Sequence, residues 1–211
     1  MAEYIERART LGHPIFYYEI SPPHGPGARD VLLGFKYVDE VFCIDREWAK
    51  YIEIFFPKKV RHLPLAGDPD DFHPLAGEKK IYDVTMVASV PEQTPDGLMR
   101  TNLANSIPDN LHVGIFGGGW RYWTRYFPKL ESRLQSAGQL SIAEVNQIYN
   151  QSKILINFHS TSHTTSLSLR TYDIALAGAF QITDYRDDFS LLFPKDFFPL
   201  YGNIKEMNEQ I

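Results

Sequence analysis

The stretch from residue 154 to residue 184 constrains the fold of this chain more than any other. It begins with the apolar run Ile154-Leu155-Ile156-Asn157-Phe158-His159, which a loop rich in serine and threonine follows. A helical pattern then begins near Leu169 and stops at Gly178, before a short apolar run that ends at Asp184. This order predicts strand, polar loop, helix and strand. Such a unit places the loop and the helix N-terminus at the carboxyl edge of a parallel sheet, where open α/β folds bind ligands.

An arginine lies in the first turn of that predicted helix. Arg170 opposes the helix dipole there, and Asp173 follows three residues later on the same face. One interpretation is a local ion pair, which contributes little when it is exposed. The other is an anion site, in which the helix N-terminus and the guanidinium share a diphosphate while Asp173 accepts hydrogen bonds from a ribose or sugar hydroxyl. The position of Arg170 favours the anion site.

Composition limits the class of protein. The chain has 211 residues, of which 44% are hydrophobic, so it can bury a substantial core in one large or two small domains. A net charge of −5 argues against a general nucleic-acid binder.

The single cysteine, Cys43, excludes an internal disulfide and fits a reducing compartment. The sequence shows neither an apolar run long enough to span a membrane nor a signal peptide, so it predicts a cytoplasmic protein.

Strand and helix patterns alternate along the chain. Apolar runs at 15–20, 38–44, 60–63, 82–88, 111–116 and 154–159 predict strands, and helices are expected at 3–11, 28–36, 46–56, 96–105 and 141–150. This alternation predicts an α/β fold with a parallel sheet covered by helices on both faces. Prolines and glycines over residues 64–80 predict a boundary between a first segment, 1–75, and a second domain, 76–211.

Three consecutive glycines follow one predicted strand directly. Gly117, Gly118 and Gly119 would let a ligand or another backbone come close, and their N–H groups could form an anion nest. A tight turn between strand and helix is the alternative. The spacing matches neither the dinucleotide fingerprint nor the Walker phosphate loop, which disfavours a nucleotide-dependent oxidoreductase.

Two histidines lie in the polar loop. His159 and His163 have a spacing seen in metal sites, but the glutamate of a zinc-protease helix is absent between them. At the carboxyl end of a strand, His159 could instead donate to a phosphate or substrate, or be an ordinary hydrogen-bonded loop histidine. No sequence motif supports a hydrolase, since a Gly-x-Ser-x-Gly motif is absent.

The order of these features resembles the C-terminal half of the CgeB-like, spore-maturation type glycosyltransferases. The matching segments are 63–66, 82–89, 115–120, 148–159 and 170–184. The resemblance implies the GT-B fold, with a Rossmann-like second domain preceded here by part of a first Rossmann-like domain. It also implies a nucleotide-diphosphate sugar as the donor substrate, with Gly117, Gly118, Gly119 and Arg170 at its diphosphate. No Asp-x-Asp motif is present, so no obligatory metal or other cofactor is expected.

The resemblance assigns further roles residue by residue. Asp173 takes the position of an acid that contacts the donor ribose, where the family usually has glutamate. A second glutamate eight positions earlier is replaced by Thr165, so its role near the transferred sugar is not carried over. Glu19 and His24, at the carboxyl edge of a first-domain strand, are candidates for a base that deprotonates the acceptor, and His159 is a third catalytic candidate.

The chain is shorter than such enzymes. Residues 1–63 supply only about three strands, and the sequence stops inside the helical pattern Asn203–Ile211, so we expect a fragment or a degenerate homologue. The leading hypothesis is a glycosyltransferase, or its donor-binding portion, acting on an unknown glycan, protein or small-molecule acceptor. The alternative is a non-catalytic module that binds a nucleotide or nucleotide sugar, or serves in assembly.

Overall fold

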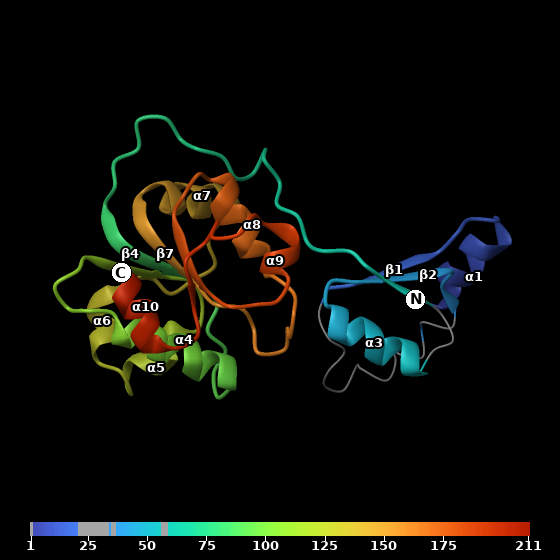
Figure 1. Cartoon of the computed structure of the whole chain (residues 1–211), viewed down its shortest axis with the longest axis horizontal. Coiled ribbons are helices and arrows are strands. Elements are labelled where there is room, and N and C mark those ends of the chain that lie inside the picture. Colours follow the sequence, from blue (N-terminus) through green and yellow to red (C-terminus); the bar gives the residue numbers. More distant parts are fainter. Residues whose placement is uncertain (1, 21–33, 35–36, 56–58) are drawn as a thin grey trace. The chain divides into compact units, whose positions relative to one another are not determined.

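The computed structural model describes residues 2–20, 34, 37–55 and 59–211. Their contacts divide the chain into two units, each built around its own parallel sheet (Figure 1). Unit 1 comprises Met1–Leu65, Ser162–Leu167 and Arg186–Asp188, and unit 2 comprises Ala66–Thr161, Ser168–Tyr185 and Phe189–Ile211. Parallel sheets flanked by helices confirm the predicted α/β fold class. The division at residues 65 and 66 falls within the proline-rich and glycine-rich stretch 64–80.

Unit 1 contains a three-stranded parallel sheet in the order β1-β2-β3. Its elements are α1 (Ala2–Thr10), β1 (Phe16–Glu19), β2 (Glu40–Cys43), α3 (Arg46–Phe55) and β3 (Val60–His62). Cys43 is buried in the core of this unit, and burial raises the pKa of its thiol to about 11. The helix predicted over 28–36 falls almost entirely outside the described residues.

Unit 2 contains a six-stranded sheet in which every pair of neighbours is parallel. The strands are β4 (Tyr82–Val87), β5 (Val113–Phe116), β6 (Leu134–Ser136), β7 (Ser152–Asn157), β8 (Gln181–Asp184) and β9 (Leu200–Tyr201). They lie in the order β6-β5-β4-β7-β8-β9, which is the doubly wound Rossmann order. The order reverses between β4 and β7, so the loops after these two strands leave the sheet on either side of one crevice.

Helices cover both faces of the six-stranded sheet (Figure 1). They are α4 (Pro95–Ser106), α5 (Trp120–Thr124), α6 (Lys129–Arg133), α7 (Ile142–Asn150), α8 (Leu169–Leu176), α9 (Phe189–Leu192) and α10 (Ile204–Gln210). Local sequence sets several of their ends. Thr94 caps α4, Ser141 and Glu144 form a reciprocal capping box on α7, and Gly178 follows α8 with a left-handed φ of 67°.

The core of unit 2 consists of two apolar clusters. Met86 of β4 and Ile115 of β5 point into one cluster, with residues of α4, α5, α6 and α10. The next residues along these strands, Val87 and Phe116, point into the other, with residues of α7 and α8. Successive strand residues face opposite sides of a sheet, so the sheet is buried on both faces.

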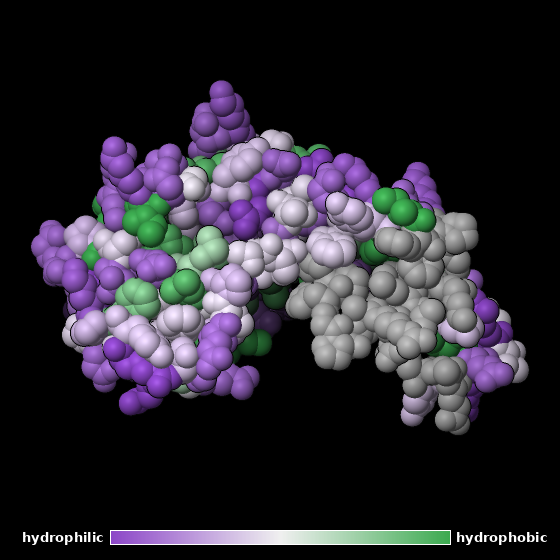
Figure 2. Space-filling model, turned by 90° about the horizontal axis from the view of Figure 1, so that it is seen from below, coloured by the Kyte–Doolittle hydropathy of each residue, from purple (hydrophilic) through white to green (hydrophobic). Residues whose placement is uncertain are grey.

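The surface differs from this core. Figure 2 shows one face of the molecule, where hydrophilic and intermediate residues cover most of the described surface and hydrophobic residues form small groups. Within the ranges that the structure describes, no helix has the length and apolar character that spanning a bilayer requires.

Candidate functional site

A cavity of about 340 Å³ opens at the carboxyl edge of the six-stranded sheet. Residues that follow β4, β5 and β6 line it, together with residues of α7 and α8: Val87, Ala88, Ser89, Gly117, Gly118, Gly138, Gln139, Leu140, Val145 and Arg170. Open α/β sheets bind ligands at this edge, near the point where the strand order reverses. The fold therefore brings Gly117, Gly118 and Arg170, predicted from separate parts of the sequence, to one cavity.

The three glycines of this turn lie in different surroundings, so the physical reason for a glycine differs among them. A Cβ on Gly117 would lie 2.3 Å from the Ala88 carbonyl oxygen, and one on Gly119 would lie 2.0 Å from that of Val90. Both glycines also have left-handed φ values, 114° and 85°. The close neighbour at these two positions is thus another backbone. Gly118 is different, because a Cβ there would meet nothing within 4 Å.

The predicted anion nest is only partly available. The Gly117 N–H already donates to the Ser136 carbonyl at 3.0 Å. Gly119 does not belong to the cavity lining among the described residues. Gly118 is therefore the glycine whose position suits close approach of a ligand.

Arg170 brings positive charge to the cavity. It is the second residue of α8, and the side chain of the N-cap residue, Ser168, accepts no capping hydrogen bond from the backbone of the helix. The positive end of the α8 dipole and the guanidinium therefore lie together. Both features favour a bound phosphate group.

A second arginine, Arg100 of α4, lies close to Arg170. Burial lowers the pKa of Arg100, and the positive charge of Arg170 lowers it further. Arg100 donates to the carbonyl oxygen of Ser89, which lines the cavity. No sequence pattern indicated this placement, because Asp96 and Arg100 have the spacing of an ordinary helical ion pair.

Asp173 lies on the same helix but is covered. Its residue is only 8% exposed, and a Cβ on Gly67 would lie 3.2 Å from its Oδ1 atom. Burial raises the pKa of Asp173 to about 6; Arg170 opposes this shift, and Asp71 adds to it. Among the described residues, Asp173 is not part of the cavity lining. Its contact with a donor ribose stays a prediction.

A family model described as glycosyl transferase-like matches residues 98–211, which is more than half of the chain. The chain belongs to this glycosyl transferase-like family. The matched residues include the glycine turn, α7, α8 and the strands from β5 onward. No curated protein sequence is similar enough to count as a match.

Solved glycosyltransferase structures share this fold. Sucrose-phosphate synthase from Thermosynechococcus elongatus is 11% identical, with a TM-score of 0.67 over 99% of this chain and 67% of that chain. Anabaena Alr3699/HepE in complex with UDP-glucose is 11% identical, with a TM-score of 0.68 over 98% of this chain and 64% of that chain. The pneumococcal O-GlcNAc transferase GtfA in complex with UDP and GlcNAc is 13% identical, with a TM-score of 0.59 over 98% of this chain and 44% of that chain.

These structural similarities concern the fold of the chain. At such identities they show the fold alone, which is that of the GT-B glycosyltransferases. The chain spans about two thirds of the synthase and less of the other two proteins.

The two loop histidines of this glycosyl transferase-like chain, His159 and His163, have hydrogen-bond partners within the protein. His159 is fully buried, its Nδ1 lies 2.7 Å from Asp184 Oδ1, and its Nε2 lies 3.1 Å from Thr171 Oγ1. His163 Nδ1 lies 2.8 Å from Ser166 Oγ. Within the described part of the chain, no group of three or more His, Cys, Asp and Glu residues is arranged to hold a metal ion. These contacts fit the alternative of a hydrogen-bonded His159, whose catalytic role stays a prediction.

The two base candidates belong to unit 1. Glu19 ends β1 and is only 6% exposed, and the Tyr17 hydroxyl donates to its Oε2 at 3.0 Å. Burial and the nearby Glu19 raise the pKa of Tyr17 to about 12. His24 lies outside the described residues. The roles of both residues as a base stay predictions.

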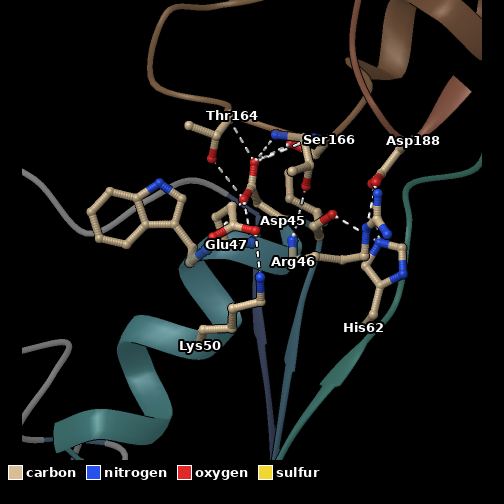
Figure 3. Close-up of polar contacts among 11 residues, drawn as sticks. Asp45, Arg46, Glu47, Lys50, His62, Thr164, Ser166 and Asp188 are labelled. Atoms are coloured by element: carbon tan, nitrogen blue, oxygen red, sulfur yellow. Dashed lines mark hydrogen bonds and ion pairs between the residues drawn. The ribbon is translucent and has the colours of Figure 1, made fainter.

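Thr165, at the position where the resemblance would place a second glutamate, is buried in unit 1. It is 4% exposed, and its Oγ1 accepts a hydrogen bond from the backbone N–H of Arg46 at 3.1 Å. Figure 3 shows its neighbours Thr164 and Ser166 gathered around Asp45, at the start of α3. Asp45 and Thr165 are 120 residues apart in the sequence, so no local pattern indicates that the loop contacts this carboxylate.

Proposed function

We propose that the cavity of unit 2 binds the diphosphate of a nucleotide-sugar donor, and that the whole protein transfers the sugar from this donor to an acceptor. One observation carries the proposal. Gly118 and Arg170 come from distant parts of the sequence, yet both line the cavity at the carboxyl edge of the sheet. Arg170 would pair with the phosphate oxygens, and the uncapped start of α8 would add its dipole.

The chemistry of transfer suits these groups. Negative charge grows on the diphosphate as the bond to the sugar breaks, and fixed donors and cations that face this charge lower the barrier. The solved neighbours support a nucleotide-sugar donor, since HepE is described with UDP-glucose and GtfA with UDP and GlcNAc. The expectation that no metal is obligatory belongs to the same proposal.

Finer assignments also belong to this proposal. Residues 76–211 would form the donor-binding domain, and residues 1–75 would be part of the acceptor side of a CgeB-like, spore-maturation type enzyme. Asp173 would contact the ribose, and Glu19, His24 and His159 are the candidates for acid–base roles. The acceptor would be a glycan, a protein or a small molecule, and a cytoplasmic location remains a prediction.

The proposal is tested by titrating the protein with UDP, GDP and ADP in a calorimeter. With the nucleotide that binds, Arg170→Ala should weaken affinity about tenfold or more, because a charge-assisted contact to phosphate is lost. Arg121→Ala is the matched control, since Arg121 is exposed on α5 and does not line the cavity. Unchanged affinity in Arg170→Ala, with the fold intact by circular dichroism, would show that the diphosphate site lies elsewhere.

A binding module without turnover is the second candidate function. The buried Thr165 favours it, because its hydroxyl is engaged by the Arg46 backbone and the family's glutamate is absent. Assays of donor hydrolysis and transfer with UDP-, GDP- and ADP-sugars separate the two functions. Nucleotide binding without turnover of any donor would select the binding module.

A further inference from the structure

Arg100 of α4 lies where the strand order of unit 2 reverses. Its Nη1 donates to the carbonyl oxygen of Ser89, which follows β4 and lines the cavity at the carboxyl edge of the sheet. Its Cζ atom lies 5.9 Å from the ring centre of Phe158, which follows β7. The strand order reverses between β4 and β7. Arg100 therefore lies against both segments that border the crevice where open α/β sheets bind ligands.

The guanidinium of Arg100 is buried, yet its hydrogen-bond donors are only partly used. The side chain is 12% exposed. Its Nε is buried and has no hydrogen-bond partner among the described residues. Its Nη2 lies 3.8 Å from Asp96 Oδ2, which is too far for a hydrogen bond. Because buried polar groups are normally hydrogen-bonded, this guanidinium keeps donors for a further acceptor.

The carboxylates that face Arg100 also hold other residues. Asp96 Oδ2 accepts a hydrogen bond from the Ser160 hydroxyl at 2.6 Å. Asp184 Oδ1 accepts one from the backbone N–H of His159 at 2.9 Å and lies 2.7 Å from Nδ1 of the same residue. Both carboxylates offset part of the positive charge of Arg100, but each has main partners of its own.

Arg170 adds a second positive charge beside Arg100. It lines the same cavity as Ser89, the residue to which Arg100 donates. Burial lowers the pKa of Arg100, the charge of Arg170 lowers it further, and Asp96 and Asp184 oppose the shift. The net lowering means that the two carboxylates do not fully compensate for burial and for the second arginine. Two guanidinium groups that repel each other at one cavity favour an anion that both can contact.

We propose that Arg100 is a second phosphate-binding residue of the donor site: Arg170 contacts one phosphate group of the donor diphosphate, and Arg100 contacts the other. This proposal rests on the proposed function, in which Arg170 pairs with the diphosphate. A guanidinium and a phosphate group form paired hydrogen bonds, and two linked phosphate groups offer one to each arginine. The two arginines thereby make the cavity selective for two linked phosphate groups over one.

The test uses the full chain with Arg100→Met, titrated in a calorimeter with the nucleoside diphosphate that binds the wild type. Methionine keeps an unbranched apolar side chain against Phe158 but removes the charge and the donors. Affinity for the diphosphate should fall about tenfold or more, because a charge-assisted contact is lost. Inorganic pyrophosphate, measured by competition with that nucleotide, should lose affinity by a similar factor. The corresponding nucleoside has no phosphate to contact Arg100, so its affinity should stay within about twofold of the wild-type value.

Arg125→Met is the matched control. Arg125 also lies over an aromatic ring, with its Cζ 4.1 Å from the ring centre of Tyr122, and its Nε donates to the Tyr122 carbonyl at 2.9 Å. It is exposed and does not line the cavity, so its replacement should leave diphosphate affinity unchanged.

Salt gives a readout that a merely structural role of Arg100 would not change. Raising the ionic strength should weaken diphosphate binding less in Arg100→Met than in the wild type, since one screened contact is gone. If Arg100→Met does not fold, Arg100→Lys keeps the charge but loses the planar pair of donors. Its diphosphate affinity should fall about threefold or more, with nucleoside affinity unchanged.

Two results would overturn the role of Arg100 while the proposed function stands. One is wild-type diphosphate affinity in the Arg100 variant when Arg170→Ala does weaken binding. The other is an equal loss for nucleoside and diphosphate, which would show a distorted cavity rather than a lost phosphate contact. Absence of UDP, GDP and ADP binding by the wild type, or unchanged affinity in Arg170→Ala, would instead overturn the proposed function, and the role of Arg100 with it.

Discussion

At the scale of single residues, the three glycines of the turn differ in what lies next to them. Gly117 and Gly119 allow the backbone of residues 88–90 to pass close by, whereas Gly118 faces open space at the cavity. The sequence predicted a close approach at this turn. It did not show which glycine meets a backbone, because the neighbouring strand lies about thirty residues earlier in the chain.

Substitutions in this turn should therefore differ in their cost. We expect Gly119→Ala to lower the free energy of unfolding by about 2 kcal/mol or more, since its φ is left-handed and the new Cβ would overlap the Val90 carbonyl. Gly118→Ala should stay within about 0.5 kcal/mol of the wild type. Denaturant unfolding of both variants checks this, and equal losses would contradict it.

Asp173 should make stability depend on pH. Its pKa is raised from 3.8 to about 6 in the folded protein, so the folded state holds a proton that the unfolded state loses. The contribution of Asp173 to the free energy of unfolding should consequently fall as pH rises from about 4 to about 6, and stay lower above that.

Asp173→Asn should remove this fall, because asparagine does not titrate. The difference in stability between variant and wild type, measured by denaturant unfolding at several pH values, should grow in favour of the variant from about pH 4 to about pH 6. A difference that does not change with pH would show that the carboxyl group titrates normally.

At the scale of elements, capping and turn residues predicted where helices begin and end, whereas two short strands were not predicted. The start of α7 at Ser141 and the end of α8 before Gly178 lie where the sequence predicted them. The strands β6 (Leu134–Ser136) and β9 (Leu200–Tyr201) were missed. Segments this short carry no periodic pattern, and only pairing with a neighbouring strand makes them strands.

The capping box of α7 should contribute measurably. Ser141 accepts from the Glu144 N–H, and the Glu144 carboxylate accepts from Ser141 in return. Ser141→Ala should destabilise the protein by about 1 kcal/mol, as losses of N-caps usually do. The control is Ser132→Ala, an exposed hydroxyl inside α6, whose effect on thermal unfolding should be smaller. Equal effects of the two variants would contradict the assigned cap.

At the scale of the whole molecule, the two units are interleaved in sequence. Unit 1 includes Ser162–Leu167 and Arg186–Asp188, which the chain reaches only after most of unit 2. Without these segments, the buried carboxylate of Asp45 would lose its loop donors. The core of unit 1 is also small.

We therefore expect the two parts of the chain to behave differently when they are produced separately. Residues 66–211 should keep the α/β signal in circular dichroism and unfold cooperatively, since both core clusters lie within them. Residues 1–65 should not unfold cooperatively. A sharp thermal transition in residues 1–65 would show that unit 1 folds without Ser162–Leu167 and Arg186–Asp188.

The sequence by itself determined the α/β class, most helices and strands, the glycine turn and the place of Arg170 in the first turn of a helix. These follow from hydrophobic periodicity, turn residues and caps, which act over a few neighbouring residues. The tertiary structure alone decided that Asp45 anchors a loop 119 to 121 residues away, that Arg100 lies beside Arg170, and that Asp173 is covered. Such contacts depend on strand order and on the path of the chain, which no local pattern encodes.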